Sequence, residues 1–102
     1  KGAAMMILPN EQWARRISGV LGNELANRFP DRAHAILTEL PEPLNGEMAY
    51  LVSLRAPKNN LTGADTIAVK FGGGGRKGAA GIDVLPTADM DKLADALEEA
   101  YA

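Results

Sequence analysis

The segment between residues 71 and 81 reads FGGGGRKGAAG, and it carries the clearest chemical signal in the sequence. Six of its eleven residues are glycine and two are alanine, so its backbone is almost free of side chains. Glycine reaches positive φ without strain, and successive backbone N–H groups can then converge on one anion. Arg76 and Lys77 lie in the segment, Lys70 precedes it, and no acid occurs between Thr66 and Ile82. The pattern predicts a local, positively charged anion site.

Two common glycine motifs do not fit this segment. Gly73, Gly75 and Gly78 satisfy G-x-G-x-x-G, but the dinucleotide fingerprint needs a strand before it and a helix after it, and we predict the reverse order. A Walker loop needs Gly-Lys followed by Ser or Thr, which Arg76-Lys77-Gly78 does not supply. The simpler alternative is a flexible turn with solvated cations. We favour the anion site, because an ordinary connection needs only one Gly or Asn.

Hydrophobic periodicity predicts the elements that must position this segment. Apolar runs and alternation predict strands at 4–8, 34–40, 47–55 and 81–85, and helical spacing predicts helices at 11–29, 62–71 and 88–101. The two middle strands are joined by a turn-forming PEPLNG and should pair antiparallel. We therefore predict an α/β fold, a single small domain in the order β-α-β-β-α-β-α, with helices packed on a mixed sheet.

The same periodicity predicts which residues form the core. The first strand is apolar throughout, which is typical of a strand buried on both faces. In the first helix we expect a buried stripe in which Trp13 packs in the core and does not stack on a base; its members are Trp13, Ile17, Leu21, Leu25 and Phe29. Thr62 is expected to cap the second helix, and His34, at the start of a strand, is interpreted as structural.

Composition excludes several classes of protein. The chain of 102 residues has a net charge of −2, which argues against a basic surface for duplex DNA. It has no cysteine, which excludes a disulfide scaffold and fits a cytoplasmic protein. The apolar stretch Ala3–Leu8 is far shorter than the roughly 20 residues that a membrane span needs. Because the chain begins with Lys and not with Met, we expect it to be one piece of a longer protein.

One family combines these features. The sequence has Val52-Ser53-Leu54-Arg55 at a strand end, then a short helix ending in Ala68-Val69-Lys70-Phe71, four glycines, a cation, and Gly78-Ala79-Ala80-Gly81 entering a strand. This arrangement resembles the DHH-associated C-terminal domain, the smaller, substrate-binding lobe of the Asp-His-His (DHH) phosphoesterases. That family includes RecJ-type exonucleases, nano-RNases and cyclic dinucleotide phosphodiesterases, and related domains end alanyl-tRNA synthetases. The resemblance covers nearly the whole chain in element order.

The resemblance implies the residues of a substrate site. Arg55 would grip a phosphate, the backbone of Gly73 to Gly75 would cradle it, and Arg76 would stand where the family usually has histidine. Arginine neither titrates near neutral pH nor accepts a hydrogen bond, so a histidine's proton chemistry is not expected here. Ala56 stands where many relatives have serine. The implied substrate-binding residues are Ser53, Arg55, Gly72, Gly73, Gly74, Gly75, Arg76, Lys77 and Gly78.

The resemblance also implies a function. The chain would be the nucleotide- or nucleic-acid-binding lobe of a hydrolase that cleaves short oligonucleotides or dinucleotides, with no catalytic or metal-binding residues of its own. The missing DHH lobe would be its partner and would hold divalent metal, Mn or Mg. A homodimer is left open. Two alternatives remain: an exopolyphosphatase-related lobe for polyphosphate or another non-nucleotide phosphate, suggested by Arg76, and a freestanding RNA-binding module without enzymatic activity.

Overall fold

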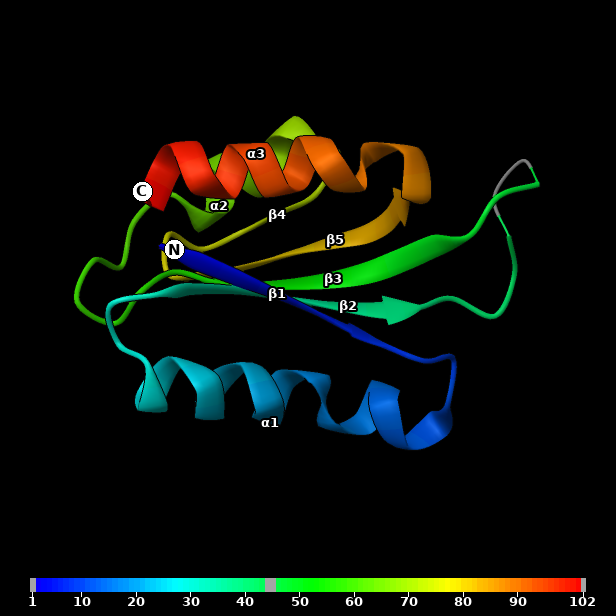
Figure 1. The fold of residues 1–102 in the computed structure, drawn as a ribbon, viewed down its shortest axis with the longest axis horizontal. Coiled ribbons are helices and arrows are strands. Elements are labelled where there is room, and N and C mark those ends of the chain that lie inside the picture. Colours follow the sequence, from blue (N-terminus) through cyan, green and yellow to red (C-terminus); the bar gives the residue numbers. More distant parts are fainter. Residues whose placement is uncertain (1, 44–45, 102) are drawn as a thin grey trace.

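A five-stranded mixed sheet separates one helix from the other two (Figure 1). The computed structural model describes residues 2–43 and 46–101. Helix α1 covers one face of the sheet, and α2 and α3 cover the other. The elements are β1 (Ala3–Leu8), α1 (Gln12–Arg28), β2 (Ala33–Glu39), β3 (Ala49–Arg55), α2 (Ala64–Lys70), β4 (Gly74–Gly75), β5 (Ala79–Pro86), a 3₁₀ turn (Thr87–Asp89) and α3 (Met90–Tyr101).

The sheet has the strand order β1-β2-β3-β5-β4. Strands β1 and β2 are parallel and α1 forms the crossover between them, whereas the other neighbouring pairs are antiparallel. The predicted α/β class, element order and antiparallel pairing of β2 with β3 are confirmed. The short β4 is the one strand that the periodicity did not predict, because it consists of two glycines.

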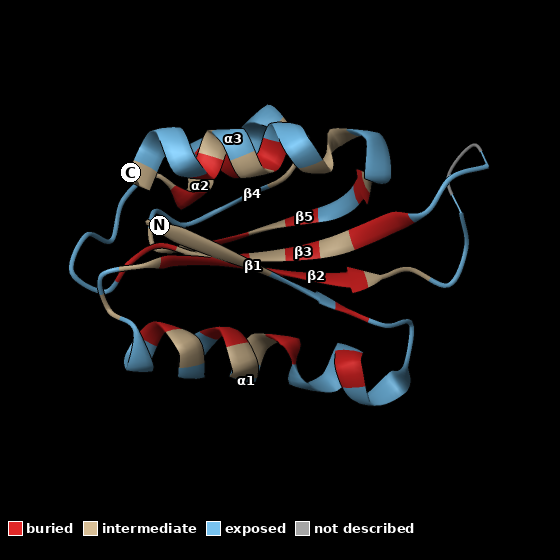
Figure 2. Cartoon of the chain, in the orientation of Figure 1, coloured by how far each residue is buried: buried red, intermediate tan, exposed pale blue. Residues whose placement is uncertain are grey.

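The main core lies between the sheet and the pair α2 and α3 (Figure 2). Each of these helices buries one face against the sheet. Their fully buried members are Ala64, Ile67 and Ala68 of α2 and Leu93 and Leu97 of α3. They pack on buried side chains of the central strands, which are Leu37, Val52, Leu54, Ile82 and Leu85. This core fixes β3 and β5, and so fixes the position of the strand end that carries Arg55.

Helix α1 is rotated relative to the prediction. Its buried residues are the small ones, Ala14, Ser18, Gly22 and Ala26, while Trp13 is 51% exposed and Ile17 is 39% exposed. The predicted core stripe is therefore wrong by one position, and Leu21 and Leu25 are only partly buried. The missing side chain of Gly22 leaves room for the aliphatic part of Arg55, whose Cγ lies 3.3 Å from where a Cβ on Gly22 would be.

Two further predictions about local structure are wrong. Strand β1 is an edge strand, so Ile7 is 54% exposed instead of being buried on both faces. Thr62 does not cap α2; the helix begins after Gly63, which has a φ of 91°. The Thr62 carbonyl instead accepts a hydrogen bond of 2.6 Å from the Tyr101 hydroxyl, which ties the end of α3 to the start of α2.

His34 lies in β2 beneath the end of α1 and is only 2% exposed. Neither of its ring nitrogens has a hydrogen-bond partner within residues 2–43 and 46–101. Burial lowers the pKa of His34 below its ordinary value, and the positive charge of Arg32 lowers it further. Folding therefore favours the neutral form of this imidazole.

This burial predicts a pH dependence of stability. Below about pH 6.5, the ordinary pKa of histidine, the unfolded chain gains a proton on His34 that the folded chain resists. The free energy of unfolding should therefore fall as the pH drops from 7.5 to 5.5. Urea unfolding of the wild type and of His34→Phe measures this, and the variant should show the smaller loss. Equal slopes in the two proteins would contradict the assignment.

Candidate functional site

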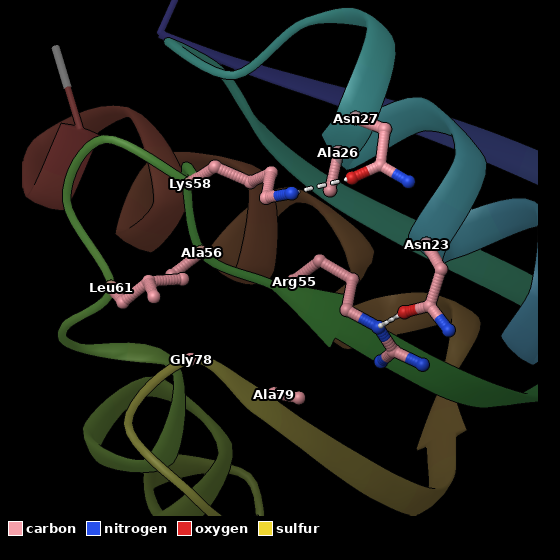
Figure 3. A pocket seen from close by; sticks show the side chains of 9 residues that line it. All are labelled: Asn23, Ala26, Asn27, Arg55, Ala56, Lys58, Leu61, Gly78 and Ala79. Atoms are coloured by element: carbon pink, nitrogen blue, oxygen red, sulfur yellow. Dashed lines mark hydrogen bonds between the residues drawn. The ribbon is translucent and has the colours of Figure 1, made fainter.

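A pocket of about 380 Å³ opens between α1, the end of β3 and the start of β5 (Figure 3). Helix α1 supplies one wall, the end of β3 and the loop that follows it supply a second, and the first residues of β5 with Gly78 supply the third. Its lining residues are Asn23, Ala26, Asn27, Arg55, Ala56, Lys58, Leu61, Gly78 and Ala79. Two of these nine carry a positive charge and none is acidic, so the pocket suits an anion.

Arg55 is held in a fixed position at the end of β3. Its Nε donates a hydrogen bond of 3.0 Å to Oδ1 of Asn23, and its Nη1 donates one of 3.0 Å to the Leu54 carbonyl. Its Nη2 makes no hydrogen bond to any residue that the structure describes, and no acid in those ranges lies within ion-pair distance of the guanidinium. The guanidinium is thus oriented while part of its hydrogen-bonding capacity remains unused.

The charge of Arg55 is uncompensated. Burial lowers the pKa of Arg55, and the positive charge of Arg76 lowers it further. Arginine stays protonated in proteins, so both effects act as a penalty on its charge and do not remove it. A bound anion would relieve both, because it supplies an opposite charge and replaces lost hydration with hydrogen bonds. The structure thus brings Arg76 close enough to influence Arg55, although Arg76 does not line the pocket.

Lys58 brings a second cation to the pocket. Its Nζ donates a hydrogen bond of 2.7 Å to Oδ1 of Asn27, one helical turn beyond Asn23 on α1. The loop that carries it is anchored by the next residue, since Asn59 donates its backbone N–H to the Pro30 carbonyl at 3.0 Å and its side chain to Asp31. Sequence reasoning missed Asn23, Asn27 and Lys58. The available signal was Gly22 inside a helix, which indicates close packing without naming the partner.

Gly72 serves the end of α2. It has a φ of 85°, its N–H donates to the Val69 carbonyl at 3.1 Å, and the Gly73 N–H donates to the Ala68 carbonyl at 2.8 Å. These two hydrogen bonds define a Schellman motif, which ends a helix with a left-handed residue that is most often glycine. The end of α2 therefore requires a glycine at position 72, whether or not a ligand binds.

The next glycines form a hairpin with β5. Gly74 pairs with Gly81 and Gly75 with Ala80, and the Arg76 N–H donates to the Ala79 carbonyl at 2.8 Å across the turn. A Cβ on Gly73 would overlap the Gly81 carbonyl, and one on Gly75 would lie 2.5 Å from Cα of Ala80. The glycines at these two positions let the edge strand approach β5.

The structure separates the nine predicted site residues into groups. Arg55 and Gly78 line the pocket, and the Gly78 carbonyl also accepts a hydrogen bond of 2.9 Å from the Ala56 N–H. Ser53 lies on β3 opposite Gly81, two residues before Arg55 and so on the same face of the sheet. The others do not line the pocket; Gly72 to Gly75 lie at the helix end and sheet edge, and Arg76 and Lys77 lie in the hairpin turn.

The hairpin geometry predicts which glycines tolerate a methyl group. Gly73→Ala should destabilise the protein by about 1–3 kcal/mol, because the new atom overlaps backbone that cannot move aside. Gly74→Ala is the matched control, since a Cβ there meets nothing within 4 Å. Thermal unfolding of both variants tests this, and equal melting temperatures would contradict it.

Two further observations concern metal binding and membrane-spanning helices. Among residues 2–43 and 46–101, no three His, Cys, Asp or Glu side chains are grouped so that they could hold a metal ion. Over the same residues, no helix combines the length and apolar character that crossing a bilayer requires.

Comparison with known proteins finds a similar fold among solved structures. No family model matches the sequence, and a search of curated proteins finds no relative. Among solved structures, the chain is similar to the pGpG-specific phosphodiesterase PggH from Vibrio cholerae, with a TM-score of 0.50 and 13% identity. The match covers 98% of this chain and 33% of that enzyme, so this chain spans about a third of the enzyme's length. At this identity the match shows the fold alone.

Proposed function

We propose that the chain is the substrate-binding lobe of a DHH-family phosphoesterase that hydrolyses short oligonucleotides or dinucleotides. The observation that carries the proposal is Arg55, a partly buried guanidinium held by Asn23 in a pocket without an acid and with hydrogen-bonding capacity to spare. A guanidinium fork can take two oxygens of one phosphate at once. The chain binds and orients the substrate, and it does not cleave alone.

A similar fold and a similar sequence motif support this proposal. The fold is similar to about a third of a pGpG-specific phosphodiesterase. The motif from Val52 to Gly81 resembles the substrate-binding lobe of the DHH phosphoesterases, in which a strand-end arginine and a glycine segment face the catalytic lobe. In this chain the arginine and Gly78 meet at the same pocket.

In the proposed enzyme this lobe holds the substrate in place for cleavage. Arg55 would fix one phosphate, and the exposed apolar side chain of Leu61 would contact the sugar or base. Fixing the substrate in this way turns cleavage into a step within one complex, which lowers its barrier. Divalent metal in the second lobe, Mn or Mg, would supply the activated water.

A small pocket favours short, single-stranded substrates. Tight binding of duplex DNA requires a surface that neutralises many phosphates, whereas this chain has a net charge of −2 and one pocket with two cations. The substrate class proposed here is therefore a nucleotide end or a short oligonucleotide.

Calorimetric titration of the chain with GMP at low salt tests the proposal. Arg55→Ala should weaken binding by about 1.5–3 kcal/mol, the usual contribution of a hydrogen bond to a charged group. Arg16→Ala is the matched control, because Arg16 is an exposed arginine on α1 outside the pocket. Binding by Arg55→Ala at the wild-type affinity would contradict the proposal.

Parallel titration with inorganic tripolyphosphate tests the second candidate function, a lobe for polyphosphate. The feature that favours this candidate is the second positive charge, on Arg76, which lies near Arg55 and which a highly charged ligand would help to neutralise. Tripolyphosphate that binds as tightly as GMP, or more tightly, would replace the nucleotide assignment.

A further inference from the structure

The outer face of α1 exposes three large apolar side chains to solvent. Trp13 is 51% exposed, Ile17 is 39% exposed and Val20 is 70% exposed. Within residues 2–43 and 46–101, α1 is the one helix on its side of the sheet, whereas α2 and α3 lie on the other side (Figure 1). A group of apolar side chains on one helix face gains free energy when another surface covers it.

The spacing of these residues is typical of a helix that packs on another helix. Trp13, Ile17 and Val20 are followed on the same face by Glu24, which is also exposed. The steps along the chain are four, three and four residues, which is the alternation of the a and d positions in a coiled coil. The buried residues of α1 form a different stripe, which faces the sheet. The helix therefore has a second face that is suited to a partner helix.

We propose that a second copy of this chain supplies the partner helix, so that the protein forms a two-fold symmetric dimer through antiparallel packing of α1 on α1. This inference goes beyond the proposed function and does not depend on it. The symmetry axis would pass between Ile17 and Val20. Ile17 of each copy would then face Val20 of the other, and the same patch would serve both partners.

Charge complementarity favours a second copy in this orientation. With the axis at that position, Glu24 of each copy lies opposite the segment of the other copy that carries Arg16. Arg16 is exposed and forms no ion pair with the residues that the structure describes. Glu24 pairs with Arg28 of its own helix at 2.9 Å, but both side chains are more than half exposed, so a carboxylate oxygen can also accept from Arg16 of the second copy. A parallel pair would instead place Glu24 against Glu24.

The proposed dimer leaves the pocket accessible. The two helices would overlap from Trp13 to Glu24, and Asn27, which lines the pocket, lies beyond that overlap. Asn23 is turned toward Arg55, to which it is hydrogen-bonded, and so away from the apolar face. Dimer formation and ligand binding can therefore be measured separately.

Sedimentation equilibrium of the 102-residue chain, from micromolar to millimolar concentration, tests the inference. The average mass of the wild type should rise with concentration toward twice that of one chain. Val20→Glu should raise the dissociation constant of the dimer about tenfold or more, because it brings two carboxylates into the centre of the interface. Val69→Glu is the matched control, since Val69 is 64% exposed on α2, on the other face of the sheet. It should dimerise like the wild type.

A charge exchange tests the direction of packing. Arg16→Glu and Glu24→Arg should each weaken the dimer, because each places like charges opposite one another. The double variant should dimerise more tightly than Arg16→Glu alone, since it restores an opposite-charge pair between the copies. A parallel dimer would show no such recovery.

Each outcome supports or overturns the inference. A wild type that remains monomeric over the whole range overturns it, and so does a dimer that Val20→Glu leaves unchanged, because that dimer would use another surface. A dimer that is sensitive to Val20→Glu but shows no recovery in the double variant overturns the antiparallel orientation. Circular dichroism spectra that match the wild type would show that the variants are folded. None of these results bears on GMP binding, which tests the proposed function independently.

Discussion

The placement of Arg55 beneath α1 is the constraint on which the pocket depends. A long cationic side chain at the end of β3 must emerge between helix and sheet, and it can do so only where the helix presents small residues. Gly22 leaves that space, and Asn23 beside it supplies the hydrogen-bond acceptor that orients the guanidinium. The helix is thereby rotated so that its larger apolar residues, Trp13 among them, are partly exposed. The same part of α1 therefore packs against the sheet and contacts Arg55 in the pocket.

The glycine-rich segment contributes to the site indirectly. Gly72 ends α2, Gly73 and Gly75 let β4 lie against β5, and the hairpin turn then brings Gly78 to the pocket wall. There the Gly78 carbonyl binds the Ala56 N–H and so joins the hairpin to the loop that carries Lys58. One backbone hydrogen bond thus joins the hairpin to the segment that carries both Arg55 and Lys58.

Much of the fold could be predicted from sequence, because the order of elements and the buried faces of α2 and α3 follow from clear periodicity. The face of α1 could not, since two adjacent stripes of the helix both look suitable: one holds large residues such as Trp13, and the other holds small ones such as Ala14. Periodicity favours the larger stripe, whereas in the structure the smaller one is buried, and its Gly22 leaves room for Arg55. The site shows the same limit: Arg55 and Gly78 belong to a local motif, but Asn23 reaches the pocket only through tertiary packing.

The role of Gly73 and Gly75 in the hairpin changes what a glycine run tells us about ancestry. Both positions exclude a side chain because of neighbouring backbone, whether or not a ligand is ever bound. Selection for a folded domain would therefore retain them in a descendant that had lost its substrate. In such a lineage the residues free to drift would be those that the fold itself does not require.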